Sequence, residues 1–215
     1  MNRSTMLRRA RRWCALLAAA LLLPLAALAS TVAPTNIVHL IDNAQDIVVG
    51  TVMTVDDGID PRGVPYTEVL LEVDETLRGV HAEVVVFRQF GLLQPRKLAN
   101  GKTLYATRPQ GWPEWRGGER VLLFLTPPAR ETGLRTTVGL AQGKFTILGN
   151  RLQAAGEQGA VFDRIAVTTN LLGPEERQLL DVATDNYDAN AFVAFVRRAV
   201  AQRWIETGSL RHATP

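Results

Sequence analysis

The segment 91–118 brings together side chains that could bind a partner. Within the segment and at its borders lie seven bases and only two acids, and aromatic residues are interleaved with the bases. Aromatic rings beside arginines and lysines serve as anchors for protein partners and as stacking surfaces for sugars or bases. The predicted binding residues are Trp112, Trp115, Tyr105, Arg96, Lys97, Lys102, Arg108 and Arg116.

The same segment also admits a structural interpretation, in which the two tryptophans close one end of a β-barrel and the charges are solvated. It holds eight glycines and prolines and no strong hydrophobic period. A connection of about 28 residues is much longer than the roughly 2–6 residues that usually join elements in a compact domain. The segment is therefore either functional or contains a helix that the sequence pattern does not reveal.

Residue types that common enzymes need are scarce in this chain. Beyond residue 29 there is no cysteine, and the serines are Ser30 and Ser209. This excludes serine and cysteine acyl-transfer enzymes, which require such a nucleophile beside a base. The histidines His39, His81 and His212 stand apart, without the H-x-x-x-H spacing or the thiolates of zinc sites. We therefore expect no catalytic residue, no metal site and no cofactor.

Three carboxylates suggest a further alternative, a hydrolase of envelope polymers. Glu68, Glu72 and Asp74 lie on one face of an expected strand. Paired carboxylates hydrolyse glycosidic bonds only at a specific separation in a cleft. The same spacing is typical of the solvent-exposed face of a sheet, which is the simpler interpretation.

Residues 1–29 have the composition of a bacterial signal peptide. Five arginines precede an apolar run of about 14 residues, Ala15–Leu28, which ends in Ala27-Leu28-Ala29. Such a run is shorter than the roughly 20 residues that a membrane-spanning helix needs, although an uncleaved anchor is the alternative. Cleavage between Ala29 and Ser30 would deliver the protein to the periplasm or the medium by Sec-type export.

Removal of this segment changes the charge of the protein. The full chain has 24 Lys+Arg and 21 Asp+Glu; without the five arginines of the signal, 19 Lys+Arg remain and the formal charge is −2. A basic protein that neutralises phosphates along its whole surface is excluded, and export also argues against nucleic acid as a partner. Because no cysteine is left for a disulfide, the fold must rest on a hydrophobic core.

The rest of the chain predicts a β-rich domain followed by helices. Strands are expected over 47–55, 66–77, 83–89, 120–126, 135–140, 144–148 and 160–162, and a short helix over 36–44. Gly50 lies in the first strand, where a glycine usually marks a bulge or a tight bend. Pro174 opens one C-terminal helix. Asp188 or Asn190 caps a second, whose apolar stripe either packs on the domain or binds a partner.

Several of these features carry a resemblance to known proteins. They are the β-branched run 44–52, Tyr66-Thr67, the strand end Leu77-Arg78-Gly79, and the segments 118–125 and 139–145. In this pattern the chain resembles a group of uncharacterised exported bacterial β-barrel proteins and, more remotely, the netrin/TIMP-like OB-fold. The resemblance covers about residues 36–148. It implies a mainly β fold, a small, closed or nearly closed OB-like barrel with a short N-terminal helix and C-terminal helices.

The expected domains follow from this fold: 1–29 is the signal peptide, 30–170 the OB-like barrel and 171–215 a helical extension. Tissue inhibitors of metalloproteinases bind the protease zinc through an N-terminal cysteine. The chain that would remain after removal of the signal peptide has no cysteine, so the resemblance does not imply this inhibitory chemistry.

The leading functional hypothesis is a non-catalytic, exported binding module of the bacterial envelope. It would contact an exported protein or an envelope glycan through residues 91–118, and a membrane only through the signal segment during export. An inhibitor or accessory protein of a secreted metalloprotease is the alternative, because loops can bind a protease without a cysteine.

Overall fold

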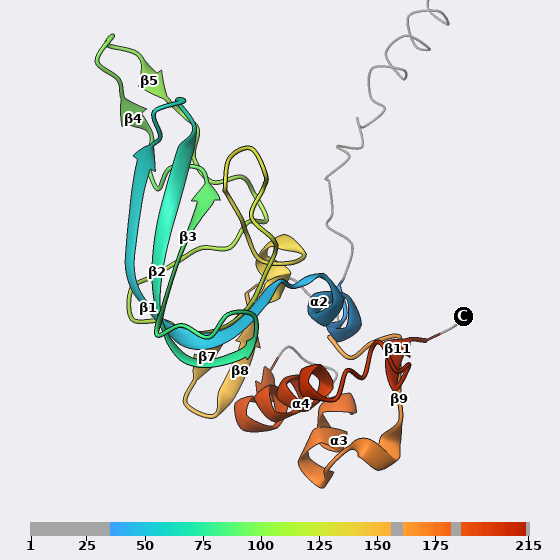
Figure 1. Ribbon diagram of the computed structural model, residues 1–215. Coiled ribbons are helices and arrows are strands. Elements are labelled where there is room, and N and C mark those ends of the chain that lie inside the picture. The colour runs from blue at the N-terminus through green and yellow to red at the C-terminus, as the bar shows by residue number, and fades with distance from the viewer. Residues whose placement is uncertain (1–34, 156–160, 182–185, 214–215) are drawn as a thin grey trace, which may run out of the picture. The chain divides into compact units, whose positions relative to one another are not determined.

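A seven-stranded antiparallel sheet is the largest feature of the structure (Figure 1). In sheet order its strands are β10 (Asn186–Asp188), β8 (Arg151–Ala154), β7 (Lys144–Leu148), β6 (Arg120–Leu125), β1 (Asp46–Ile59), β2 (Pro65–Arg78) and β3 (Val84–Phe90). The computed structural model describes residues 35–155, 161–181 and 186–213, which belong to one unit, Val32–Pro215. The expected signal peptide, with its cleavage site between Ala29 and Ser30, lies outside the described residues.

Short strands and helices complete the described elements. The two-stranded sheets pair β4 (Arg96–Lys97) with β5 (Thr103–Leu104), and β9 (Ile165–Val167) with β11 (Leu210–His212). The α-helices are α2 (Ile37–Asn43), α3 (Pro174–Leu180) and α4 (Ala189–Ala201), and the 3-10 helices are η1 (Leu140–Gly143) and η2 (Thr169–Leu171). The three α-helices lie in the stretches of sequence where helical periodicity and capping residues occur.

The large sheet is open, so the expected closed or nearly closed barrel is wrong. In the described part of the chain, β3 and β10 are its end strands and do not pair with each other. The reason is that β7 turns back into β8, which occupies the free edge of β7 and is itself extended by β10. At the other end of the sheet, the loop that contains Arg135 occupies part of the β3 edge: the Arg135 N–H donates a hydrogen bond to the Arg88 carbonyl at 2.8 Å. The mainly β class is confirmed, whereas the OB-like character stays a prediction.

Two of the expected strands do not form. Residues 135–140 contribute only an isolated bridge between Thr137 and Leu125. Of the expected strand 160–162, residue 160 lies outside the described residues, and Val161 and Phe162 lie in a turn. Conversely, β8 was not expected. Its side chains alternate between exposed and buried or half-buried positions, but four residues are too few for this alternation to identify a strand in the sequence.

β1 is irregular, and its irregularity is centred on Gly50. The register between β1 and β2 shifts at Ile47/Val48, at Val49/Gly50 and at Val52/Thr54. This confirms the bulge predicted at Gly50. A Cβ atom on residue 50 would lie 2.2 Å from the backbone oxygen of Glu72, so only glycine allows the two strands to approach this closely. Bulges bend a strand and increase its twist, and Figure 1 shows β1 strongly curved.

The centre of the sheet is buried on both faces. Because side chains alternate along a strand, β1 and β6 contribute to two separate cores. The first core contains Val49 and Phe124 together with the buried residues of α2, α3 and α4. The second contains Val48 and Leu123 together with Trp115. The 91–118 segment therefore contributes a residue to the core on the second face of the sheet.

The apolar stripe of α4 is buried in the core of this chain. The Asp188 side chain caps the helix, and Phe192 and Phe195 are fully buried in the first core. On the adjoining face of α4, the Arg197 guanidinium donates to both carboxylate oxygens of Glu75 on β2 at 2.6 and 2.8 Å. The apolar stripe of α4 therefore packs on the domain and is not available to bind a partner.

Candidate binding site

Residues 93–105 form an arm, which contains the β4–β5 hairpin. Figure 1 shows this hairpin beyond the turn that joins β1 and β2. The arm is attached to β1 through Asp57, whose carboxylate accepts a hydrogen bond from the Leu93 N–H at 2.7 Å and forms an ion pair with Arg96. The hairpin and this attachment give the first half of the 91–118 segment a definite position.

The arm presents cations and apolar side chains to solvent. Tyr105 is 76% exposed and Leu93 is 51% exposed. Lys97 and Lys102 are also exposed, and neither forms an ion pair with the described residues. Between residues 91 and 113 the sequence contains no acid. The arm is therefore a cationic surface with apolar contacts.

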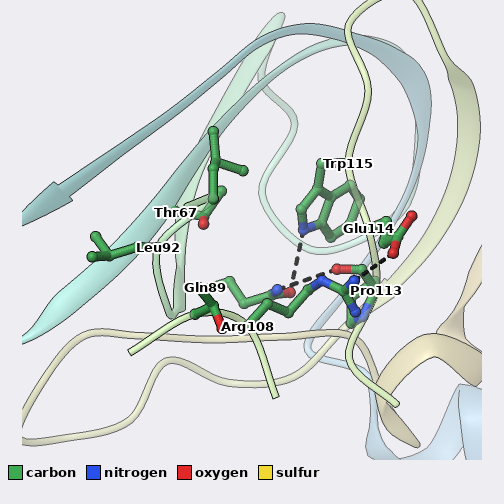
Figure 2. A pocket seen from close by; sticks show the side chains of 9 residues that line it. Thr67, Gln89, Leu92, Arg108, Pro113, Glu114 and Trp115 are labelled. Carbon is green, nitrogen blue, oxygen red and sulfur yellow. Dashed lines mark hydrogen bonds and ion pairs between the residues drawn. The ribbon is translucent and has the colours of Figure 1, made fainter. Parts of the chain in front are cut away.

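A pocket of about 420 Å³ lies between the second half of the segment and the sheet. Figure 2 shows the nine residues that line it. Two come from the sheet, Thr67 on β2 and Gln89 on β3, and the others from the segment: Leu92, Leu93, Thr107, Arg108, Pro113, Glu114 and Trp115. Leu93 lines the pocket and is also the first residue of the arm, so the pocket lies at the base of the arm.

Hydrogen bonds between buried groups hold the wall of the pocket. Gln89 is fully buried; its Oε1 accepts from the Trp115 indole N–H at 3.2 Å, and its Nε2 donates to the Pro113 carbonyl at 3.2 Å. The Thr67 hydroxyl donates to the Gly91 carbonyl at 2.7 Å. Because each of these polar groups has a partner, the wall is held in one arrangement.

Arg108 is the cation of the pocket, and its guanidinium is held at two points. Its Nη1 donates to the Trp112 carbonyl at 2.7 Å, and its Nη2 forms an ion pair with the Glu114 carboxylate. The backbone of Arg108 packs directly on Gly91, which has φ +105°, and a Cβ atom there would lie 2.8 Å from the Arg108 Cα. Gly91 is thus required for Arg108 to lie this close to the end of β3.

Trp115 is part of the second core. It is 7% exposed, with the Phe87 ring edge-on at 5.2 Å and the Lys144 ammonium 4.9 Å from the ring centre. Lys144 is itself buried; it pairs with Glu119 at 2.6 Å and donates to the Glu114 carbonyl. Trp115 therefore belongs to the core on the second face of the open sheet, whereas the structural interpretation of the sequence placed both tryptophans at one end of a β-barrel.

The burial of Lys144 predicts a dependence of stability on pH. Desolvation lowers the pKa of its ammonium below the ordinary value of 10.5, although the bond to Glu119 opposes the shift. Below 10.5 the unfolded chain therefore holds more protons on this lysine than the folded protein does, and stability rises with pH between the lowered pKa and 10.5. Urea unfolding from about pH 7 to about pH 10 should show this rise, and Lys144→Met should lack it. An equal pH slope in the two proteins would contradict the prediction.

The eight predicted site residues separate into three groups. Arg108 and Trp115 line the pocket. Arg96, Lys97, Lys102 and Tyr105 lie on the arm. Trp112 and Arg116 do neither: the Trp112 ring is half-buried, edge-on to Phe90 at 6.5 Å, and the side chain of Arg116 is 75% exposed beside Glu114.

Sequence reasoning missed Thr67 and Gln89. The sequence does contain a signal for Gln89. This residue lies two positions after Phe87 and is therefore on the same, inward face of the strand. A polar residue at an inward position needs a partner, and here that partner is the segment 91–118.

The three carboxylates on β2 do not meet in one site. Glu68 pairs with Arg88 at 2.7 Å, Asp74 pairs with Arg120 at 2.9 Å, and Glu72 is exposed. A second pocket, beside α4, is lined by Asp74 but not by Glu68 or Glu72. This arrangement is that of a charged, solvent-exposed sheet face.

Neither a metal-binding cluster nor a membrane-spanning helix occurs among the described residues. Within residues 35–155, 161–181 and 186–213, no group of three or more His, Cys, Asp or Glu side chains is arranged to hold a metal ion. No helix among the same residues has the length and apolar character needed to cross a bilayer. Comparison with known proteins finds no family model, no curated protein and no solved structure that matches this chain.

Proposed function

We propose that this protein is an exported, non-catalytic binding module that contacts a partner protein through the arm and the adjoining pocket. The observation that carries the proposal is the arm itself, on which Tyr105, Leu93, Lys97 and Lys102 are all exposed. Tyrosine is among the residue types that dominate binding energy at protein interfaces. An exposed tyrosine offers a large apolar area and a hydroxyl at a small entropic cost.

The charge of the arm favours an acidic partner. Of its bases, Arg96 is neutralised by Asp57, whereas Lys97 and Lys102 are free to attract a negatively charged surface. Such attraction raises association rates and falls with ionic strength. We therefore expect binding to weaken as salt is added.

A protein is favoured over an envelope glycan as the partner. Sugars bind proteins by stacking on exposed aromatic faces, and the paired tryptophans were the candidates for such a surface. Trp115 is buried and the Trp112 ring packs on Phe90, which leaves Tyr105 as the exposed ring of this segment. One exposed ring is a weak stacking surface for a polysaccharide, but it is sufficient as an interface anchor.

Export is the part of the proposal that rests on sequence alone. The arginine-rich start, the apolar run and the Ala29-Ser30 junction support it. An oxidising compartment suits a chain whose single cysteine, Cys14, belongs to the expected signal peptide. The partner would then be another exported protein.

A charge reversal on the arm tests the proposal. With the purified protein immobilised, extracts of envelope and culture medium are passed over it, and retained material is identified by mass spectrometry and sugar analysis. We expect one retained protein, weakened about tenfold or more in Lys97→Glu/Lys102→Glu and also reduced in Tyr105→Ala.

The matched control reverses two exposed bases elsewhere, Arg130→Glu/Arg211→Glu, and should retain the partner. Retention that ignores the arm variants, or retention of a glycan instead of a protein, would contradict the proposed function.

A further inference from the structure

We propose that the pocket recognises an acidic side chain next to an apolar one in an extended segment of the partner, and that Glu114 occupies the place of that acid in the free protein. This inference rests on the proposed function and names the chemistry that the site selects. Its basis is the Arg108–Glu114 pair at the edge of a partly apolar pocket, shown in Figure 2.

Arg108 is positioned in advance for a carboxylate. The Trp112 carbonyl fixes one of its terminal nitrogens at 2.7 Å, and the close packing of its backbone on Gly91 fixes where the side chain begins. A guanidinium held in this way loses little freedom when it binds an anion, and its planar donors suit a carboxylate. The second terminal nitrogen is the one that Glu114 now occupies.

Glu114 is a replaceable partner for that nitrogen. Its side chain is 59% exposed, and that of Arg108 is 31% exposed. An ion pair between exposed groups typically contributes between about 0 and 1 kcal/mol, so a competing carboxylate needs little energy to displace it. Once displaced, Glu114 keeps a cation nearby, because Arg116 lies 3.5 Å from its other oxygen.

The remainder of the pocket is suited to an apolar side chain. Leu92, Pro113 and Trp115 are buried residues of its lining, and Leu93 is exposed at its edge. A volume of about 420 Å³ is within the range of small-molecule pockets, so it has room for one side chain of a peptide. The polar groups of Gln89 and Thr67 are already paired with the wall, so an apolar occupant would not leave them without partners.

Charge complementarity favours a peptide that carries acids over one that is neutral. The sequence from residue 91 to residue 113 has four bases and no acid, so Glu114 is the first negative charge that the segment itself provides. A partner segment with carboxylates would replace this charge at Arg108 and meet Lys97 and Lys102 along the arm.

The test uses two substitutions that should act in opposite directions. The probe is a terminally blocked hexapeptide of alternating leucine and glutamate, and binding is followed by NMR through the indole N–H signal of Trp115. Glu114→Gln removes the internal competitor and should tighten binding about fivefold, as expected for the loss of an exposed ion pair. Arg108→Gln removes the cation and should weaken binding about tenfold or more.

Three controls complete the design. Arg130→Gln removes an exposed cation that lies outside both the arm and the pocket, and should change binding less than about twofold. A hexapeptide of alternating leucine and glutamine should not bind measurably, and neither should sulfated dextran at the same charge concentration. If Arg108→Gln proves unfolded by circular dichroism, Arg108→Lys, which keeps the charge without the planar donors, takes its place with the same expected direction.

Several results would overturn the inference: no saturable shift with the glutamate peptide, weaker binding in Glu114→Gln as well as in Arg108→Gln, or equal binding of the glutamine peptide. These failures are separate from a failure of the proposed function. If capture of a partner depends on Lys97 and Lys102 while Arg108 and Glu114 variants capture it normally, the arm stands and the pocket proposal is wrong.

Discussion

Replacing Gly50 with alanine is expected to lower the free energy of unfolding by about 3 kcal/mol. The added Cβ atom would lie 2.2 Å from the Glu72 backbone oxygen and 3.1 Å from Leu71 Cγ. Relief would require β1 to move away from β2, but β1 is also bonded to β6 along its other edge. Because small domains are stable by only about 5–15 kcal/mol, urea or thermal unfolding will detect this loss readily.

The control for Gly50→Ala is Gly117→Ala. Gly117 is exposed, and the nearest atom to its added Cβ would be the Met53 carbonyl oxygen at 3.5 Å, an ordinary contact. The expected change is within about 0.5 kcal/mol. Similar stability losses in the two variants would mean that crowding at the β1 bulge is not the cause.

Truncation of Trp115 to alanine is expected to cost about 4 kcal/mol, the usual cost of emptying a large buried aromatic site. The second core would lose its ring contact with Phe87 and the cation–π contact with Lys144. Gln89 would also lose the indole N–H that its Oε1 accepts. Equilibrium unfolding in urea measures the loss, and near-ultraviolet circular dichroism reports on the packing around the rings.

Trp112→Ala and Tyr105→Ala are the comparisons that give this result its meaning. The Trp112 ring is half-buried, so Trp112→Ala should lower the free energy of unfolding by about 1–2 kcal/mol. Tyr105 is exposed, so Tyr105→Ala should change it by no more than about 0.5 kcal/mol. If Trp115→Ala is as stable as the unchanged protein, Trp115 does not stabilise the second core, and its assignment to the pocket wall is wrong. A loss of binding in Trp115→Ala reports on folding first, so Tyr105 and the two lysines of the arm are the better tests of binding.

The sequence alone determined the elements that carry strong local signals. β2 follows from the regular alternation of its side chains, and α4 from a capping Asp188 followed by an apolar stripe. The bulge at Gly50 follows from a glycine inside a β-branched run. Each of these signals is local, because strand alternation, helix capping and glycine flexibility act over a few residues.

The composition of residues 91–118 also indicated where a site could lie, because the excess of bases and the interleaved aromatics are visible in the letters. The sequence could not assign a role to each aromatic ring. Trp112, Trp115 and Tyr105 have similar chemistry and similar neighbours in the sequence. Their burial differs because only Trp115 enters the second core.

Only the tertiary structure decided that the sheet stays open and that Thr67 and Gln89 share a pocket with Arg108. Both outcomes depend on contacts between residues far apart in the chain. Closure depends on which strand occupies each free edge, and here β8 and β10 occupy the edge of β7. The pocket depends on the return of residues 107–115 across β2 and β3. Local propensity contains no information on such pairings, which are selected by the packing of the whole domain.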